Sequence, residues 1–353
     1  MTGALNVVIA GAGPVGLTLA VLLQNAGHRV RVFERDTGPD ARIRGGTLDL
    51  HADLGQRVLD AAGVLETFRR VARITRQRAV DPSGVVLMDE IPDAPEIDRM
   101  DLRRLLIDAL AEHVVAWGHR LETLERQDRQ WLLGFENGAT MRADLVIGAD
   151  GGRSRVRHFV TDSEPTPTGT YVMQAEIASP WAAAPDFAAL ANGGNLMARG
   201  RGVMFFSTTR GDGSINFYVS ARREEPVEEL LSDWAPLFHQ AVAAATEWTP
   251  LPMRVLRADW QRHPHAGAVT LVGDAAHVMP PFGGIGVNIG LVDALHLSNA
   301  LAARTSVVDA LSAYEQEMTR LALPAQLDTE QSELALHGDA TLDELMAARD
   351  ERQ

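Results

Sequence analysis

Hydrophobic residues near the start of the chain predict a strand, a helix and a second strand in close succession. The β-branched run at residues 7–9 suits a buried parallel strand. Apolar residues recur at helical spacing over residues 17–23, and Gly27 suits the C-cap of that helix. A further apolar run at residues 30–33 predicts the second strand. This order of elements is typical of a βαβ unit in an α/β fold.

Three glycines in the spacing G-x-G-x-x-G separate the first strand from the helix. Gly11 allows a tight turn, Gly13 lets the backbone approach a pyrophosphate, and Gly16 lets the helix pack closely on the strand. Glu34 ends the second strand, where a carboxylate accepts hydrogen bonds from a ribose. Together they predict a dinucleotide site, for NAD or FAD, in preference to a glycine-rich turn of some other α/β fold.

Two later strands also end in turns that suit a ligand. The apolar run 145–147 leads into a glycine-rich turn with Asp150, and we expect a helix with three arginines after it. The run 268–272 ends at Asp274, whose carboxylate can hold polyol hydroxyls. The loop 280–286, first proline-rich and then glycine-rich, leads into a helix whose first N–H groups can face a developing negative charge.

Between these two turns the pattern changes to short strands separated by polar loops. Strands are expected over residues 171–177, 203–208, 214–220 and 253–258, a helical stretch over 224–245, and an earlier hairpin over 78–88. We interpret this region as an inserted antiparallel sheet that covers the cofactor and supplies the substrate pocket.

Composition narrows the classes of function. The 353 residues carry a formal net charge of −14, which argues against nucleic acid or an anionic membrane as partner, because phosphate binding needs clustered cations. No apolar run approaches a membrane span, and the first strand starts too early for a signal peptide, so we expect a cytoplasmic protein. The absence of Cys and Lys excludes a thiolate nucleophile and a Schiff-base lysine. We expect no metal site, because His263 and His265 lack further ligands at a suitable spacing.

Two polar segments are candidate ligand contacts. The loop 40–55, with Arg42 and Asp49, either faces a ligand or is a plain surface loop. Arg99 and Arg103 lie one turn apart on a predicted helix, where they are either solvated or in reach of a flavin and its phosphates.

The three ligand turns, in this order, resemble those of the class A FAD-dependent monooxygenases of the para-hydroxybenzoate hydroxylase type. The likeness is closest to the tetracycline-inactivating monooxygenases and runs over nearly the whole chain. The stretches that carry it are residues 41–51, 96–106, 144–162, 273–295 and 314–318. It implies a Rossmann-like FAD-binding domain (1–75, 99–169 and 262–305), an inserted antiparallel-sheet substrate-binding domain (76–98 and 170–261), and a long bridging C-terminal helix (306–353).

The resemblance implies FAD as cofactor and gives roles to individual residues. Glu34 binds the adenosine ribose, Arg103 contacts the FAD, and Asp274 contacts the ribitol–pyrophosphate region. No catalytic side chain is assigned with certainty, because the flavin carries the chemistry and Pro281, Gly284 and Gly286 flank its isoalloxazine. The expected cofactor-binding residues are Gly11, Gly13, Gly16, Glu34, Arg35, Arg42, Asp49, Arg103, Asp150, Asp274, Pro281, Gly284, Gly286, Val287 and Asn288.

Departures from the family fall on the substrate side. Gln174 matches a substrate-binding Gln, whereas Asn195 and Asn216 replace an Arg and a His, and Ile285 replaces a Gln in the glycine loop. The expected substrate-binding residues are Gln174, Asn195, Met197, Phe206, Asn216, Pro281 and Gly283.

The resemblance implies a hydroxylation. NADPH or NADH reduces FAD, the reduced flavin captures O2 as a C4a-hydroperoxide, and an oxygen atom passes to an electron-rich carbon of a phenol or enol. A tetracycline is the leading substrate, and we expect the enzyme to act as a monomer. The alternatives are an aromatic or polyketide hydroxylase with another substrate, another flavin oxidoreductase, or a non-catalytic flavin- or ligand-binding protein. A flavin-dependent halogenase is excluded, because it needs a lysine.

Overall fold

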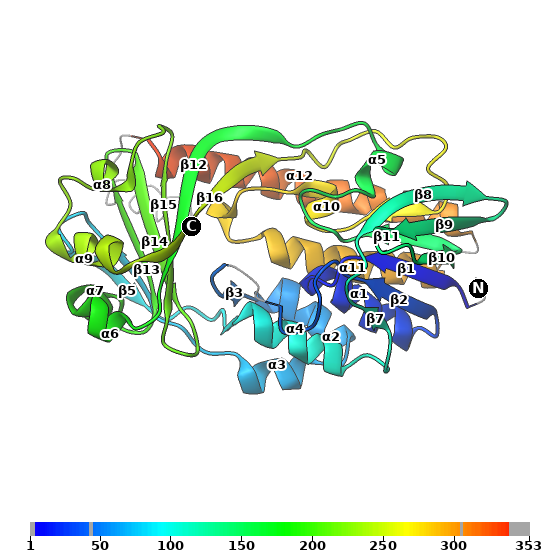
Figure 1. Cartoon of the computed structure of the whole chain (residues 1–353), viewed down its shortest axis with the longest axis horizontal. Helices are drawn as coiled ribbons and strands as arrows, with labels where there is room; N and C mark the ends of the chain where they lie inside the picture. The colour runs from blue at the N-terminus through cyan, green and yellow to red at the C-terminus, as the bar shows by residue number, and fades with distance from the viewer. Residues whose placement is uncertain (1–3, 42–44, 304–305, 339–353) are drawn as a thin grey trace.

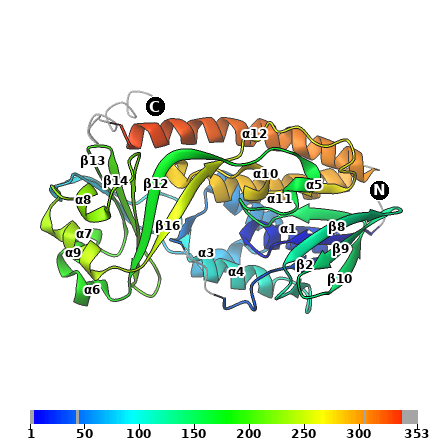
Figure 2. The ribbon, with the colours of Figure 1, turned by 45° about the horizontal axis from the view of Figure 1, so that its top comes forward.

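The computed structural model describes residues 4–41, 45–303 and 306–338 (Figure 1). A parallel sheet with its helices forms one half of the molecule, and a larger sheet forms the other half. The last helix, α12, runs along both halves (Figure 2). No described helix is long and apolar enough to cross a membrane.

The parallel sheet brings the three ligand turns to one edge. Its strand order is β17 (Val269–Leu271), β11 (Leu145–Gly148), β1 (Asn6–Ala10), β2 (Arg29–Phe33) and β7 (Val115–Ala116). All of the pairings are parallel, and β1, β11 and β17 are neighbours. The turns after these three strands therefore meet at the carboxyl edge, where α/β sheets bind their ligands.

Helices pack closely around this sheet. Helix α1 (Pro14–Asn25) lies against α11 (Gly286–Ala303), and a Cβ added at Gly290 would stand 2.7 Å from the Val15 side chain. The glycine thus permits the close approach of the two helices. The other helices of this half are a π-helix (Ala52–Gln56), α2 (Arg57–Ala61), α3 (Leu65–Val71), α4 (Arg99–Asp108), α5 (Arg157–Val160), α10 (Asp274–His277) and a 3₁₀-helix (Pro281–Gly283). Two small antiparallel sheets complete it, β8 (Leu121–Gln127), β9 (Gln130–Phe135) and β10 (Thr140–Ala143), and β3 (Leu48–Asp49) with β6 (Glu96–Ile97).

The second half is built on a seven-stranded sheet. Its order is β16 (Thr246–Val255), β12 (Thr166–Ile177), β15 (Ile215–Ala221), β14 (Val203–Thr209), β13 (Asn195–Gly200), β4 (Gln77–Val80) and β5 (Val86–Glu90). Phe205, Phe217 and Phe238 pack together in its core. The covering helices are α6 (Pro180–Ala183), α7 (Pro185–Ala191), α8 (Val227–Leu230) and α9 (Pro236–Ala244).

Helix α12 (Val307–Leu336) is fastened to both halves. Near its start, the Tyr314 hydroxyl donates to the Leu271 carbonyl at 2.8 Å. At its end, the buried Arg199 of β13 donates to the carbonyls of Leu336 (2.7 Å) and Ala335 (2.6 Å). A cation placed on the last carbonyls complements the helix dipole as well as their unpaired acceptors. The helix therefore fixes the position of the two sheets relative to each other.

The predicted fold class is confirmed, with four corrections to its elements. Strand β13 was not predicted, and it pairs in parallel with β4, so the larger sheet is mixed. The helix expected over 224–245 is divided into α8 and α9, because Pro226 and Pro236 start new helices.

The strand expected over 253–258 is instead Thr246–Val255, and its two prolines are tolerated because it is an edge strand. The helix expected to carry three arginines is only the four residues of α5, and of the three it contains Arg157 alone.

Candidate functional site

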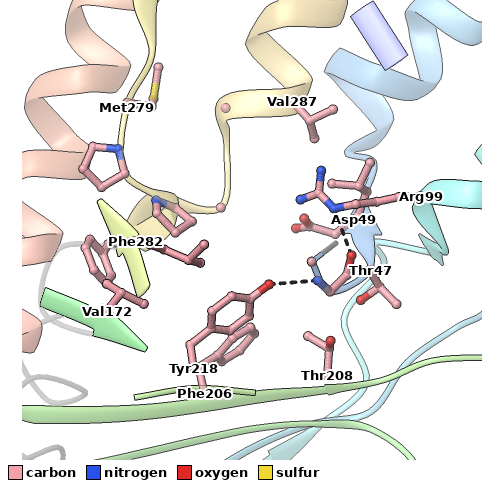
Figure 3. A pocket seen from close by; sticks show the side chains of 18 of the residues that line it. Thr47, Asp49, Arg99, Val172, Phe206, Thr208, Tyr218, Met279, Phe282 and Val287 are labelled. Atoms are coloured by element: carbon pink, nitrogen blue, oxygen red, sulfur yellow. Dashed lines mark hydrogen bonds between the residues drawn. The ribbon is translucent and has the colours of Figure 1, made fainter. Parts of the chain in front are cut away.

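A cavity of about 780 Å³ lies between the carboxyl edge of the parallel sheet and the face of the larger sheet (Figure 3). Its volume is in the range of sites for cofactors and small molecules. The lining on the parallel-sheet side includes Gly13, Pro14, Val15, Ala149, Gly151, Asp274, Gly284, Gly286 and Val287. The lining on the other side includes Val172, Gln174, Asn195, Met197, Met204, Phe206, Thr208, Tyr218, Leu251 and Met253.

The first glycine turn combines tight packing with open space. A Cβ at Gly11 would stand 2.3 Å from the Ala149 carbonyl oxygen, so this turn rests directly on the second ligand turn. No protein atom lies within 4 Å of a Cβ added at Gly13, which is the N-cap of α1 and has no side chain to cap the helix. The start of α1 therefore presents its N–H groups toward the cavity, as an anion site requires.

The buried Glu34 stabilises the glycine turn through hydrogen bonds to its backbone. Its carboxylate accepts hydrogen bonds from the backbone N–H groups of Ala12 (2.7 Å) and Asp36 (3.0 Å). Glu34 is buried and does not line the cavity. Its position beside the turn agrees with the βαβ geometry from which the ribose contact was predicted, and that contact stays a prediction.

Arg103 does not line the cavity; it is buried and bonded to Asp36, just after strand β2. It is 2% exposed, pairs with Asp36 at 2.9 Å and stacks over the ring of Trp117 at 4.8 Å. Asp150 also turns inward, because its Oδ2 accepts from the Arg155 N–H at 2.7 Å, whereas its buried Oδ1 has no protein partner. Among the other predicted contacts, Arg35 is exposed and outside the lining, and Arg42 lies outside the described residues.

Asp274 opens onto the cavity beside a buried ion pair. Its side chain is exposed on the cavity wall, and the surrounding protein raises its pKa by desolvation, although His277, Arg99 and Arg157 oppose the rise. Behind it, Asp293 Oδ2 accepts from His277 Nε2 at 2.5 Å and from the Gly273 N–H at 2.9 Å. Burial lowers the pKa of His277, but the neighbouring carboxylate of Asp293 outweighs it, so the net change is upward.

Asn288 fastens the loop that carries Asp49. Its amide donates to the Asp49 carbonyl at 3.0 Å, and its oxygen accepts from the N–H groups of His51 (3.0 Å) and Gly55 (3.2 Å). Asn288 is fully buried and does not line the cavity, whereas Asp49 does. Asn288 therefore acts on the site through the loop that it positions.

The segment that precedes Asp49 is also hydrogen-bonded to the larger sheet, at the edge of the cavity. The Gly46 N–H donates to the Tyr218 hydroxyl at 2.8 Å, and Arg99 Nε donates to the Gly46 carbonyl at 3.1 Å (Figure 3). Tyr218 stacks on Phe206, a predicted substrate contact, at 6.5 Å. Neither Tyr218 nor Thr47 was proposed from the sequence, because their importance depends on contacts between distant segments.

The predicted substrate residues do not all reach the cavity. Gln174, Asn195, Met197, Phe206 and Pro281 line it. Asn216 lies on the same face of β15 as the lining residue Tyr218, but it is fully buried, is not part of the lining, and donates to the Ala175 carbonyl at 3.2 Å. Gly283 lies against α12, where an added Cβ would stand 2.5 Å from the Thr329 hydroxyl.

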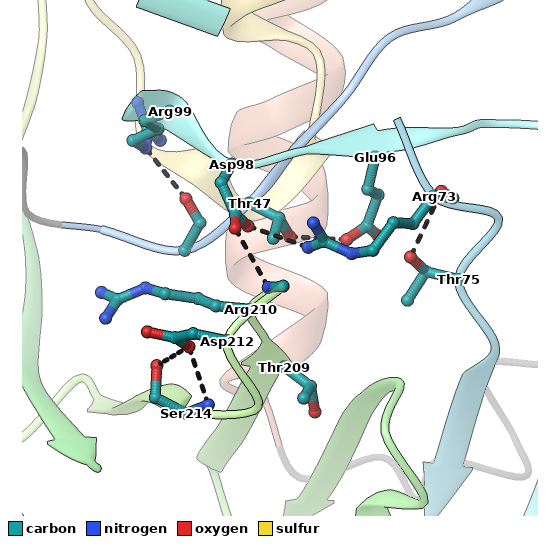
Figure 4. A network of polar contacts seen from close by, with 12 residues as sticks. Thr47, Arg73, Thr75, Glu96, Asp98, Arg99, Thr209, Arg210, Asp212 and Ser214 are labelled. Carbon is teal, nitrogen blue, oxygen red and sulfur yellow. Dashed lines mark hydrogen bonds and ion pairs between the residues drawn. The ribbon is translucent and has the colours of Figure 1, made fainter. Parts of the chain in front are cut away.

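A buried carboxyl group, that of Glu96, is part of the cavity lining. Figure 4 shows it within its network of polar contacts. Glu96 is 2% exposed and accepts a hydrogen bond from Thr47 Oγ1 at 2.5 Å and another from Asn195 Nδ2. Burial raises the pKa of Glu96, the two hydrogen bonds lower it, Asp49 raises it and Arg73 lowers it, with a net rise. Glu96 was not proposed from the sequence, because its burial depends on Thr47 and Asn195, which are distant in sequence.

The residues present fit an FAD molecule. The open space at Gly13, the uncapped start of α1 and the carboxylate of Asp274 together offer contacts for a diphosphate and a polyol. Within the described ranges, no group of three His, Asp or Glu residues is arranged to hold a metal ion.

Comparison with known proteins supports this fit. The family described as "FAD binding domain" matches residues 4–327. Monooxygenase penA of Penicillium thymicola is 27% identical over 369 residues, which cover 85% of each chain. The 3-amino-4-hydroxybenzoate 2-monooxygenase of Streptomyces cremeus is 29% identical, over 85% of this chain and 79% of its own. The structure of tetracycline destructase Tet(55) shares the fold, with a TM-score of 0.82 at 21% identity, over 99% of this chain and 95% of its own.

Proposed function

The chain belongs to the FAD-binding-domain family, and from this membership we propose that it is an FAD-dependent monooxygenase. It uses NADPH or NADH and O2 to hydroxylate a phenolic or enolic carbon of a polycyclic small molecule. The observation that carries the proposal is a single cavity lined by the glycine turns on one side and by apolar side chains on the other. A protein that only carried the cofactor would need the glycine turns but would not need an apolar wall facing them.

The residues that would hold FAD lie at the ends of the parallel strands. The start of α1 at Gly13 would receive the pyrophosphate, Glu34 the adenosine ribose, and Asp274 the ribitol hydroxyls. When bound, FAD supplies the redox chemistry that activates O2 for transfer to carbon. The protein supplies position, polarity and exclusion of water.

Water is excluded by the walls of the substrate half. Met197, Met204, Phe206, Leu251 and Met253 give this half an apolar surface from three strands. A planar ring system would bury its faces against these side chains, which keeps its reacting carbon in one place and the site dry. Gln174, which is 4% exposed, is the polar group of β12 on the lining and would orient a ring hydroxyl or carbonyl.

A tetracycline is the leading substrate in this proposal. It is supported by the motifs shared with the tetracycline-inactivating monooxygenases, by the retained Gln174 and by a cavity long enough to join both sheets. A second candidate is a different aromatic or polyketide substrate of the same reaction class. It is favoured by Asn195, which stands where the family has an Arg and is bonded to Glu96.

The test is aerobic turnover by the FAD-loaded protein with NADPH and a tetracycline, followed by mass spectrometry. We expect a yellow protein, NADPH oxidation that rises on addition of the drug, and a product heavier by one oxygen atom. Gln174→Ala should lower kcat/KM for the drug, whereas Gln261→Ala, at an exposed Gln outside the lining, should not. NADPH oxidation with unchanged drug would reject the tetracycline, and a protein that retains no FAD would reject the enzyme class.

A further inference from the structure

Acidic groups dominate the ionisable lining of the cavity. In the described part of the lining, Asp49, Glu96 and Asp274 are acidic and Arg99 is the basic residue. Arg99 already donates through Nε to the Gly46 carbonyl. A negatively charged substrate would therefore enter a site that offers it more repulsion than attraction.

Glu96 is the acidic lining residue that is bonded to the larger sheet. Its carboxylate is tied to Asn195 of β13, and therefore to the sheet that carries Met197 and Phe206. Arg73, whose backbone is hydrogen-bonded to that of Glu96, directs its guanidinium to Asp98 at 2.8 Å (Figure 4). Among the described residues, no Arg or His forms an ion pair with Glu96.

The carboxyl group still has capacity to accept hydrogen bonds. Each of its oxygens receives one donor, from Thr47 and from Asn195, and a carboxylate offers about four lone-pair positions. The ionisable group at this end of the cavity is thus an acceptor with spare capacity, and a substrate that fits it must donate.

We propose that Glu96 makes the cavity selective for a substrate that is neutral or positively charged and carries an N–H or O–H donor, and selective against a carboxylate. This inference rests on the proposed function only in taking the apolar half of the cavity as the place where substrate binds. This preference would distinguish the protein from enzymes that act on hydroxybenzoates, because those enzymes must bind a substrate that carries a carboxylate.

The test compares three hydroxynaphthalenes that differ at one ring position, which carries a carboxylate, a carboxamide or an aminomethyl group. Each is titrated into the oxidised FAD-loaded protein at neutral pH, and binding is followed by the change in flavin absorbance. We expect the carboxamide and the amine to bind at least about tenfold more tightly than the carboxylate, because like charges about 6 Å apart cost roughly this much even when strongly screened. This ordering in the unaltered protein does not depend on the folding of any variant.

A variant then assigns the selectivity to one residue. Glu96→Gln keeps the shape and an acceptor but removes the charge, and we expect the preference to shrink to about threefold or less. Glu90→Gln, at an exposed Glu of β5, should leave the preference unchanged.

Equal or tighter binding of the carboxylate to the unaltered protein would overturn the inference. An unchanged preference in Glu96→Gln, or no binding of any of the three compounds, would overturn it as well. The titration needs no turnover, so the selectivity can hold while the proposed hydroxylation fails, and the reverse.

Discussion

Replacing Asn288 with Ala should loosen the loop that shapes the cavity without touching any lining side chain. Asn288 joins α11 to residues 49–55 through three hydrogen bonds, to the Asp49 carbonyl and to the N–H groups of His51 and Gly55. Its side chain is fully buried, so truncation leaves these backbone groups without their partner. The loop carries Asp49, which lines the cavity, so the loss should reach the cofactor site.

The magnitude follows from the number of bonds. A net contribution of about 1 kcal/mol per hydrogen bond gives about 3 kcal/mol for the three, before any water enters to replace them. At about 2 °C per kcal/mol for a large chain, the Tm should fall by about 6 °C. The affinity for FAD should also fall, because the loop must be ordered again when the cofactor binds.

The assay is thermal unfolding of the apo and FAD-loaded forms, together with titration of FAD into the apo protein. Asn299→Ala is the matched control, since it makes the same change at an exposed position of the same helix. Asn299→Ala should leave both the Tm and the FAD affinity unchanged. If Asn288→Ala behaves like Asn299→Ala in both measurements, the loop does not depend on Asn288 and the reasoning is wrong.

Three further predictions follow from the geometry. Gly13→Ala should leave the apo Tm unchanged but lower FAD affinity at least about tenfold, whereas Gly11→Ala should destabilise the apo protein itself, because only the first has free space for a Cβ. The free energy of unfolding should fall as pH rises above about 6.5, because the raised pKa of His277 means that the folded state binds this proton more tightly; Asp293→Asn should flatten this dependence. Tyr218→Phe should lower kcat/KM about fivefold, because the loop N–H above the cavity loses an acceptor worth about 1 kcal/mol.

Each of these predictions has its own control or contrary result. A Gly13→Ala protein that binds FAD normally would contradict the placement of the pyrophosphate. Stability of the unaltered protein that stays constant or rises as the pH increases from about 6.5 would contradict the assignment of the His277 proton. For Tyr218, the control is Tyr171→Phe, at an exposed tyrosine of β12, and equal effects of the two would refute the role of the hydroxyl.

Local patterns predicted the half of the molecule that is built from parallel strands. The run at residues 7–9 and Gly11, Gly13 and Gly16 form the predicted strand, turn and helix, because each of these features depends on residues close in sequence. The two later ligand turns were also found, since a buried apolar run and a glycine-rich end suffice to identify them. Their meeting at one edge then follows from parallel pairing.

The larger sheet was harder to predict because its polar residues are buried by distant partners. Strand β13 contains the polar residues Asn195 and Arg199, which are more typical of a loop. They are buried in a strand because Asn195 bonds to Glu96 and Arg199 bonds to the end of α12. Asn216 lies on the same face of β15 as the lining residue Tyr218 but is fully buried, because the alternation along a strand indicates the face of a residue and not its exposure. The breaks at Pro226 and Pro236 were visible in the sequence, and the expected helix should have been divided there.

The site shows the same division. Glycines and acids at strand ends were found from local spacing, whereas Thr47, Glu96 and Tyr218 were missed. The Gly46 N–H and the Tyr218 hydroxyl are 172 positions apart in sequence, and no local pattern marks such a contact. The lining residues that depend on contacts between distant segments are therefore the ones that only the folded chain identifies.

The most direct test of the central claim uses isotopic oxygen. The FAD-loaded protein is incubated with NADPH, a tetracycline and ¹⁸O2, and the product is examined by mass spectrometry. We predict one ¹⁸O atom in the product, with NADPH consumption that depends on the drug. A product that takes its new oxygen from water, or drug-independent NADPH consumption without any oxygenated product from this or another phenolic substrate, would contradict the assignment of this cavity to a monooxygenase.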